Sequence, residues 1–159
     1  MKLKLLAFLT FSVVLLGCQS ATENEHENHS DHGKNSTPKT PVDSLYVQVM
    51  DIHDQVMPKM GKIRGAQKQA QQMLDSLSLL PAGQAKAAAS YKQNLETLIS
   101  DLNYADFAMD KWMVEFNLDS AKDNLELRMA YLRSELDKVT AVKKAILGSL
   151  SKADSLLKK

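Results

Sequence analysis

Apolar residues recur at alternating intervals of four and three positions through the middle of the chain. Between residues 42 and 80 this spacing is interrupted once, at Lys59, where a charged residue beside Met60 takes the place of an apolar one. Apolar positions that repeat every 3.5 residues on average predict an amphipathic helix of the coiled-coil type. The positions in this first series are Leu45, Val49, Ile52, Val56, Ile63, Ala66, Ala70, Met73, Leu77 and Leu80.

Two more series with the same spacing follow and predict helices over about residues 82–116 and 119–157. The second consists of Ala88, Tyr91, Leu95, Leu98, Leu102, Ala105, Met109, Trp112 and Phe116. The third consists of Leu125, Met129, Leu132, Leu136, Val139, Lys143, Ile146, Leu150, Ala153 and Leu157, with Val142 beside the charged Lys143.

Turn and cap residues separate these segments. Thr40, Pro41 and Asp43 form a typical helix start, with a capping hydroxyl, a proline at the first position and an early acidic residue. Residues 80–83 (Leu-Pro-Ala-Gly) and 117–120 predict turns, with Asp119 as the cap of the third helix. Pro58, followed by Gly61 and Gly65, predicts a bend in the first helix.

Three long helices joined by short turns run antiparallel. The sequence therefore predicts an all-α fold for residues 42–159, an antiparallel three-helix bundle of the coiled-coil type, with helices at about 42–80, 82–116 and 119–157.

The first residues have the features of an export signal. Lys2 and Lys4 precede an apolar run over residues 5–16. Twelve helical residues rise about 18 Å, which is too short for a hydrocarbon core of about 30 Å. The run therefore predicts the apolar region of a secretory signal.

The run ends in Leu15-Leu16-Gly17-Cys18, which resembles the lipobox of bacterial lipoproteins. The resemblance implies that residues 1–17 are removed and that Cys18 becomes a lipidated first residue, holding the protein on a membrane of the bacterial cell envelope. Gln19 in place of the aspartate that often retains lipoproteins at the inner membrane favours the outer membrane. The alternative is an ordinary cleaved signal peptide with Cys18 as a free thiol.

Residues 18–41 form a polar tether between this cysteine and the first helix. From residue 19 to 40 no apolar side chain is larger than alanine, so the segment is predicted to be disordered. His26, His29 and His32 lie three residues apart within it. Imidazoles are ligands for Zn²⁺ and Cu²⁺, so the tail is either a metal-binding tract or a solvated linker.

Composition excludes several classes of function. Lysine and arginine total 20 against 19 acidic residues, which lacks the basic surplus of a nucleic-acid binder. One cysteine cannot form a disulfide within its chain. The chain contains no glycine-rich phosphate loop, CxxC or HExxH motif, and His53 is the one histidine beyond the tether. We therefore expect no catalytic residues and no enzyme.

A stripe of Met50, His53, Met57 and Met60 follows the three-four-three spacing of one helix face. With turns near residues 81 and 118, position 53 is expected level with about 109, and 109 with about 127. Met109, Met113 and Met129 would then join the stripe. Asp106 and Asp110, one turn apart, would orient the imidazole. Asp51 and Asp54 flank His53 in the sequence, but residues one or two apart on a helix point in different directions.

Thioether sulfur with imidazole suits Cu(I). The alternative interpretation is that these methionines fill an irregular core or form an adaptable surface for a partner.

Residues 52–60 (Ile-His-Asp-Gln-Val-Met-Pro-Lys-Met) and 108–113 (Ala-Met-Asp-Lys-Trp-Met) resemble the signature stretches of a family of small helical lipoproteins of Bacteroidetes-type bacteria. The family carries the label "viral A-type inclusion protein". The resemblance covers about residues 42–159. It implies lipidation and an all-helical domain in a bacterial envelope, and it supplies no catalytic residue.

These observations predict a membrane-anchored exported lipoprotein with a non-enzymatic binding or scaffold role. Its expected partners are the membrane, through the lipid, and a protein that docks on the helical surface, with no nucleic acid. The alternative is copper or zinc binding by the histidine tail, the Met/His stripe, or both; otherwise we expect no cofactor.

Overall fold

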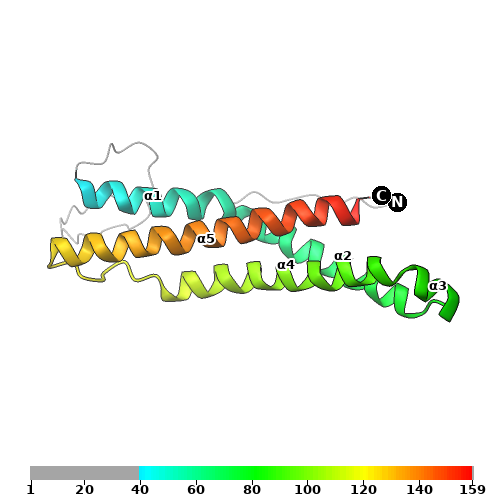
Figure 1. Cartoon of the computed structure of the whole chain (residues 1–159). Helices are drawn as coiled ribbons and strands as arrows, with labels where there is room; N and C mark the ends of the chain where they lie inside the picture. Colours follow the sequence, from blue (N-terminus) through cyan, green and yellow to red (C-terminus); the bar gives the residue numbers. More distant parts are fainter. Residues whose placement is uncertain (1–39, 159) are drawn as a thin grey trace, which may run out of the picture. The chain divides into compact units, whose positions relative to one another are not determined.

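The computed structural model describes residues 40–158, and every regular element in this range is helical (Figure 1). The predicted all-α class is confirmed. The predicted signal peptide, Cys18 and the tail residues His26, His29 and His32 lie outside the described residues. Within the described range, no helix combines the length and apolar character that a membrane span requires.

Helix α1 (Pro41–Val56) begins with the predicted cap. The Thr40 hydroxyl accepts the backbone N–H of Asp43, and the Asp43 carboxylate accepts the backbone N–H of Thr40, both at 3.1 Å. Pro41 occupies the first turn, where a missing N–H costs no hydrogen bond. Reciprocal capping therefore sets the start of α1.

The predicted bend lies at Pro58. Residues Met57–Lys59 form a 3-10 turn between α1 and helix α2 (Met60–Ser78). Proline lacks the N–H that would continue the α-helical ladder and clashes with the preceding turn. Gly61 and Gly65, which were expected to contribute to the bend, lie inside α2 and do not interrupt it.

The predicted helix over 82–116 is divided at Ala88 into a short helix α3 (Ala82–Ala87) and helix α4 (Ala89–Glu115). No residue of α3 is buried, whereas α4 buries one face along its length. The short helix therefore lacks the tertiary packing that stabilises most helices in proteins.

The third helix begins later than predicted. Helix α5 spans Leu125–Leu157, and its N-terminal cap is Asn124, whose side chain accepts the N–H of Leu127 at 3.0 Å. Asp119 is not the cap, because the Asn117 side chain accepts its N–H at 2.9 Å and holds it in a turn. Residues 117–124 thus form a longer connection than expected.

Helix α4 runs antiparallel to α2. Arg64 contacts Asp106 at 3.1 Å, and Gln67 donates to Asn103 at 3.1 Å. As the residue number rises along α2, that of its partner on α4 falls.

The same argument makes α4 antiparallel to α5. The Lys152 ammonium contacts Asp101, and the Trp112 indole donates to Glu135. Helix α5 also packs along α1 and α2.

Of the nineteen core positions predicted on the first two segments, ten are buried, and six more are half-buried and pack against them. The buried cluster consists of Val49, Val56, Met60, Ile63, Ala70, Leu95, Leu98, Leu102, Ala105, Met109, Trp112, Val139, Val142, Ile146, Ala153 and Leu157.

On α5, however, alternate core positions are shifted by one residue. Leu136 and Leu150 were expected in the core and, like the charged Lys143, are only half-buried, whereas the residue before each of the three is buried. The buried residues Glu135, Val142 and Ser149 keep the same heptad spacing. The sequence pattern missed Glu135 and Ser149 because they are polar, whereas Val142 was already noted beside the charged Lys143.

Candidate functional site

His53 lies at the interface of α1 and α4. Its side chain is 18% exposed, and its ring centroid lies 5.6 Å from that of Trp112. Its Nδ1 is 2.8 Å from a carboxylate oxygen of Asp54. In the tautomer in which Nδ1 donates to this carboxylate, Nε2 of the neutral ring presents its lone pair.

The partner of this imidazole differs from the prediction. Asp54 was expected to point away from His53, but its carboxylate contacts the ring. Asp106 and Asp110, expected to orient the ring, lie 3.1 and 3.7 Å from the guanidinium of Arg64. These two carboxylates therefore join α4 to α2.

Trp112 also holds a buried carboxylate that the sequence analysis missed. Glu135 is 2% exposed and accepts the indole N–H of Trp112 at 3.0 Å through one oxygen. Its other oxygen accepts Lys138 Nζ at 2.8 Å. This hydrogen bond raises the pKa of Lys138 above its ordinary value. A buried acidic side chain is tolerated here because both of its oxygens have donors.

Stacked rings continue from Trp112 toward the connection between α4 and α5. The centroid of Phe116 lies 5.0 Å from that of Trp112 and 6.2 Å from that of Tyr131. The Tyr131 hydroxyl accepts the N–H of Asn117 at 2.7 Å. The connection is therefore fastened to α5 by aromatic packing and a hydrogen bond.

The structure separates the candidate methionines into different environments. Met60 and Met109 are buried in the core, and Met57 and Met113 are half-buried against it. Met57 also lines a surface pocket with His53, Asp54 and Pro58.

Met50 and Met129 are half-buried. The expected register of Met129 is wrong, because residues 117–124 lengthen the connection and Trp112 lies beside Glu135. Within residues 40–158, no three His, Cys, Asp or Glu side chains are placed to hold a metal ion.

A groove lies between α4 and α5 beside Trp112. Tyr104 and Phe107 line it and are each 62% exposed, which is high for aromatic side chains. The groove has a volume of about 320 Å³. The remaining lining residues are Ala108, Lys111, Trp112, Glu115, Lys138 and Val142.

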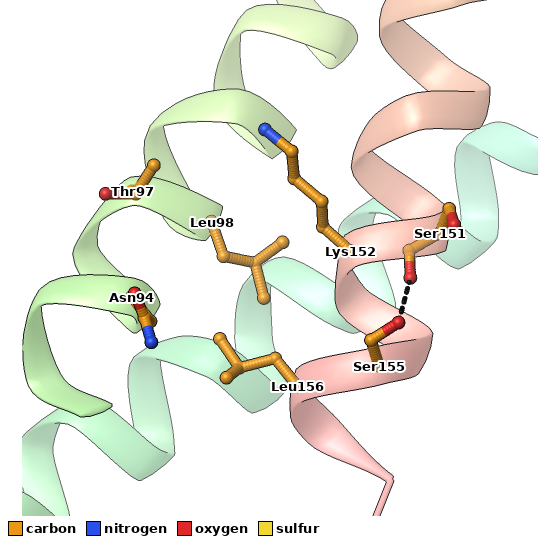
Figure 2. A pocket seen from close by; sticks show the side chains of 7 residues that line it. All are labelled: Asn94, Thr97, Leu98, Ser151, Lys152, Ser155 and Leu156. Carbon is orange, nitrogen blue, oxygen red and sulfur yellow. Dashed lines mark hydrogen bonds between the residues drawn. The ribbon is translucent and has the colours of Figure 1, made fainter. Parts of the chain in front are cut away.

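A second groove between α4 and α5, near the C-terminal end of α5, is shown in Figure 2. Leu98 and Leu156 lie between hydroxyl-bearing residues of the two helices. Ser155 donates to the carbonyl of Ser151, and Thr97 donates to that of Gln93, each at 3.0 Å. Because each of these two hydroxyls donates to a carbonyl of its own helix, neither is free to donate to a ligand in this groove.

No protein-family model matches this chain, and neither a curated protein nor a solved structure is similar enough to be matched. Its function is therefore inferred from its own residues.

Proposed function

We propose that this chain is an exported, lipid-anchored protein of the bacterial envelope that binds another protein and carries out no catalysis. The lipobox-like sequence at Cys18 supports the anchor. The pairwise directions of α2, α4 and α5 support an antiparallel three-helix bundle in which α1 and α2 together form one of the three helical segments.

The α4–α5 groove with exposed Tyr104 and Phe107 is the observation that carries the binding role. Aromatic side chains are enriched at protein interfaces, where they bury a large area with little loss of side-chain freedom. The nearest cations are already paired, since Lys111 lies 3.6 Å from Glu115 and Lys138 lies 2.8 Å from Glu135. The partner that fits is the apolar face of an amphipathic helix, with no requirement for a matching charge.

Site-specific photo-cross-linking in cells tests this role. A photoreactive residue at Tyr104 or Phe107 should capture one consistent protein. Leu79, which is 86% exposed at the end of α2, is the matched control position. The purified partner should then bind the chain directly, and the double substitution Tyr104→Ser/Phe107→Ser should weaken binding about tenfold or more. The same products at Leu79 as in the groove would refute the proposal.

Cu(I) binding by His53 and Met57 is the second candidate, favoured by one specific observation. The two side chains line the same pocket, and Asp54 holds the far nitrogen of the imidazole. A carboxylate that accepts the second N–H of a histidine is the usual support for a metal-bound imidazole. In this hypothesis His53 Nε2 and the Met57 sulfur bind the ion, and the tail histidines His26, His29 and His32 provide a separate copper or zinc site.

Competition with a chromogenic Cu(I) chelator measures this second function. His53→Ala and Met57→Leu should each remove one bound Cu(I), while Met73→Leu, a half-buried methionine on α2, should not. Equal Cu(I) binding by all three variants would exclude the His53 site.

A further inference from the structure

Large apolar side chains are exposed around the connection between α4 and α5. They are Val114 (86% exposed), Leu118 (52%), Leu125 (67%) and Leu127 (59%). They occupy the last turn of α4, the connection and the first turn of α5, so they lie at one end of the helical domain. We call these four residues the tether-end surface.

The chain enters the domain at the same end. Lys143 on α5 donates to Gln55 on α1, and Gln69 on α2 donates to the carbonyl of Leu157. Residue numbers therefore rise together along these elements, and α5 begins at the end where α1 begins. Figure 1 shows the start of α1 beside the start of α5. Whatever precedes Thr40 leaves the domain here.

With residues 19–40 as the coil that their composition predicts, a lipid at Cys18 would stay close to this end. A coil of 22 residues, which the composition of residues 19–40 predicts, spans about 25 Å on average. The 33 residues of α5 extend about 50 Å, so the opposite end of the domain lies much farther from the anchor. We propose that the tether-end surface contacts the lipid bilayer that carries the anchor, a proposal that rests on the lipid anchoring proposed above.

The charges at this end indicate how it would contact the bilayer. Asp119 is paired with Lys122, whose hydrogen bond and charge lower the pKa of Asp119, and Asp123, Glu126 and Arg128 are nearby in the sequence. Among residues 40–158, no cluster of basic side chains occurs at this end to attract anionic lipid. The contact is therefore made by apolar side chains, and it should be equally strong on zwitterionic and anionic bilayers and insensitive to salt.

A tryptophan reporter tests the contact in the full, cell-processed chain. Leu127→Trp is compared with Leu79→Trp, the matched exposed leucine at the end of α2, after reconstitution into phosphatidylcholine vesicles. Trp112, the sole natural tryptophan, is a constant background that the parent protein measures. Circular dichroism checks that both variants keep the helical fold.

Brominated acyl chains should quench the added tryptophan at position 127 by about half or more, because interfacial side chains sit about 5–10 Å into the boundary between headgroups and acyl chains. The reporter at position 79 should keep its emission. Absence of quenching at 127, or equal quenching at both positions, overturns the proposal. The proposal is also overturned if the tryptophan at position 127 is already shielded from solvent without vesicles and its emission does not change when they are added, because a second copy of the chain then covers the surface.

The mass of the N-terminal peptide tests the anchor separately. Lipidated Cys18 without quenching at position 127 overturns the bilayer contact and leaves the anchor. Quenching at 127 with unmodified Cys18 supports the contact and overturns the anchor. Unmodified Cys18 in a protein that does not associate with vesicles overturns both.

Discussion

The buried carboxylate of Glu135 allows a sharp test of the packing between α4 and α5. Trp112→Phe keeps an aromatic ring at the interface and removes the indole N–H that Glu135 accepts at 3.0 Å. Glu135→Leu replaces the carboxylate with an apolar side chain of similar size. The double variant removes both partners of the hydrogen bond, so the four proteins form a double-mutant cycle.

The expected magnitudes follow from burial. A hydrogen bond to a charged group contributes about 1.5–3 kcal/mol. The smaller ring of phenylalanine buries less apolar area, which costs about 1 kcal/mol more. Trp112→Phe should therefore destabilise the protein by about 2.5–4 kcal/mol. In that background Glu135→Leu should be stabilising, because it removes a buried charge that has lost a donor. Lys138 is 52% exposed, so it can be hydrated when Glu135 is replaced.

Urea unfolding followed by circular dichroism at neutral pH measures all four free energies of unfolding. We expect a coupling free energy of about 1.5–3 kcal/mol between Trp112 and Glu135. A control cycle that pairs Trp112→Phe with Asp137→Leu, an exposed carboxylate two residues along α5, should be additive. Additivity of Trp112 and Glu135 within about 0.5 kcal/mol would refute the buried hydrogen bond.

Three other predictions can be measured by the same unfolding assay. Ala121 has φ 55°, so Ala121→Gly should stabilise the protein by about 0.5 kcal/mol, whereas Ala141→Gly on the exposed face of α5 should destabilise it by about 1 kcal/mol; the same sign for both would be inconsistent with the turn. Asn124→Ala should lower the free energy of unfolding by about 1 kcal/mol, because it removes the cap of α5. Asp119→Ala should leave the helix content unchanged. A loss of stability with Asp119→Ala and none with Asn124→Ala would instead identify Asp119 as the cap. Glu135 raises the pKa of Lys138 above 10.5, so the stabilisation by protonated Lys138 is present at neutral pH and lost as pH rises through the raised pKa. The free-energy difference between the parent and Lys138→Met should therefore narrow above pH 10.5, and a difference that widens would contradict this coupling.

Local signals in the sequence were sufficient for the start of the first helical segment and for its bend at Pro58, but not for the division of the second segment at Ala88. Thr40 and Pro41 mark the start of α1, and Pro58 marks its end, because each acts through its own hydrogen-bonding capacity and backbone geometry. Burial along α4 also follows its apolar series, because every series position from Leu95 to Trp112 is apolar and buried. Helix class and the core face of α4 could therefore be predicted without knowledge of tertiary contacts.

The contacts between α4 and α5 could not be predicted in the same way, because they depend on the length of the connection and on pairs of side chains distant in sequence. Asp119 and Asn124 are both suitable caps, and the side chain of Asn117 decides between them by holding Asp119 in a turn. The later start of α5 moves Met129 out of its expected register. Glu135 is unfavourable in a core by itself and becomes acceptable once Trp112 and Lys138 donate to it. A polar residue one position before an expected apolar core residue, as Glu135 stands before Leu136, should therefore be examined as a core candidate, because a buried carboxylate keeps the heptad spacing when its hydrogen-bond donors come from outside the series.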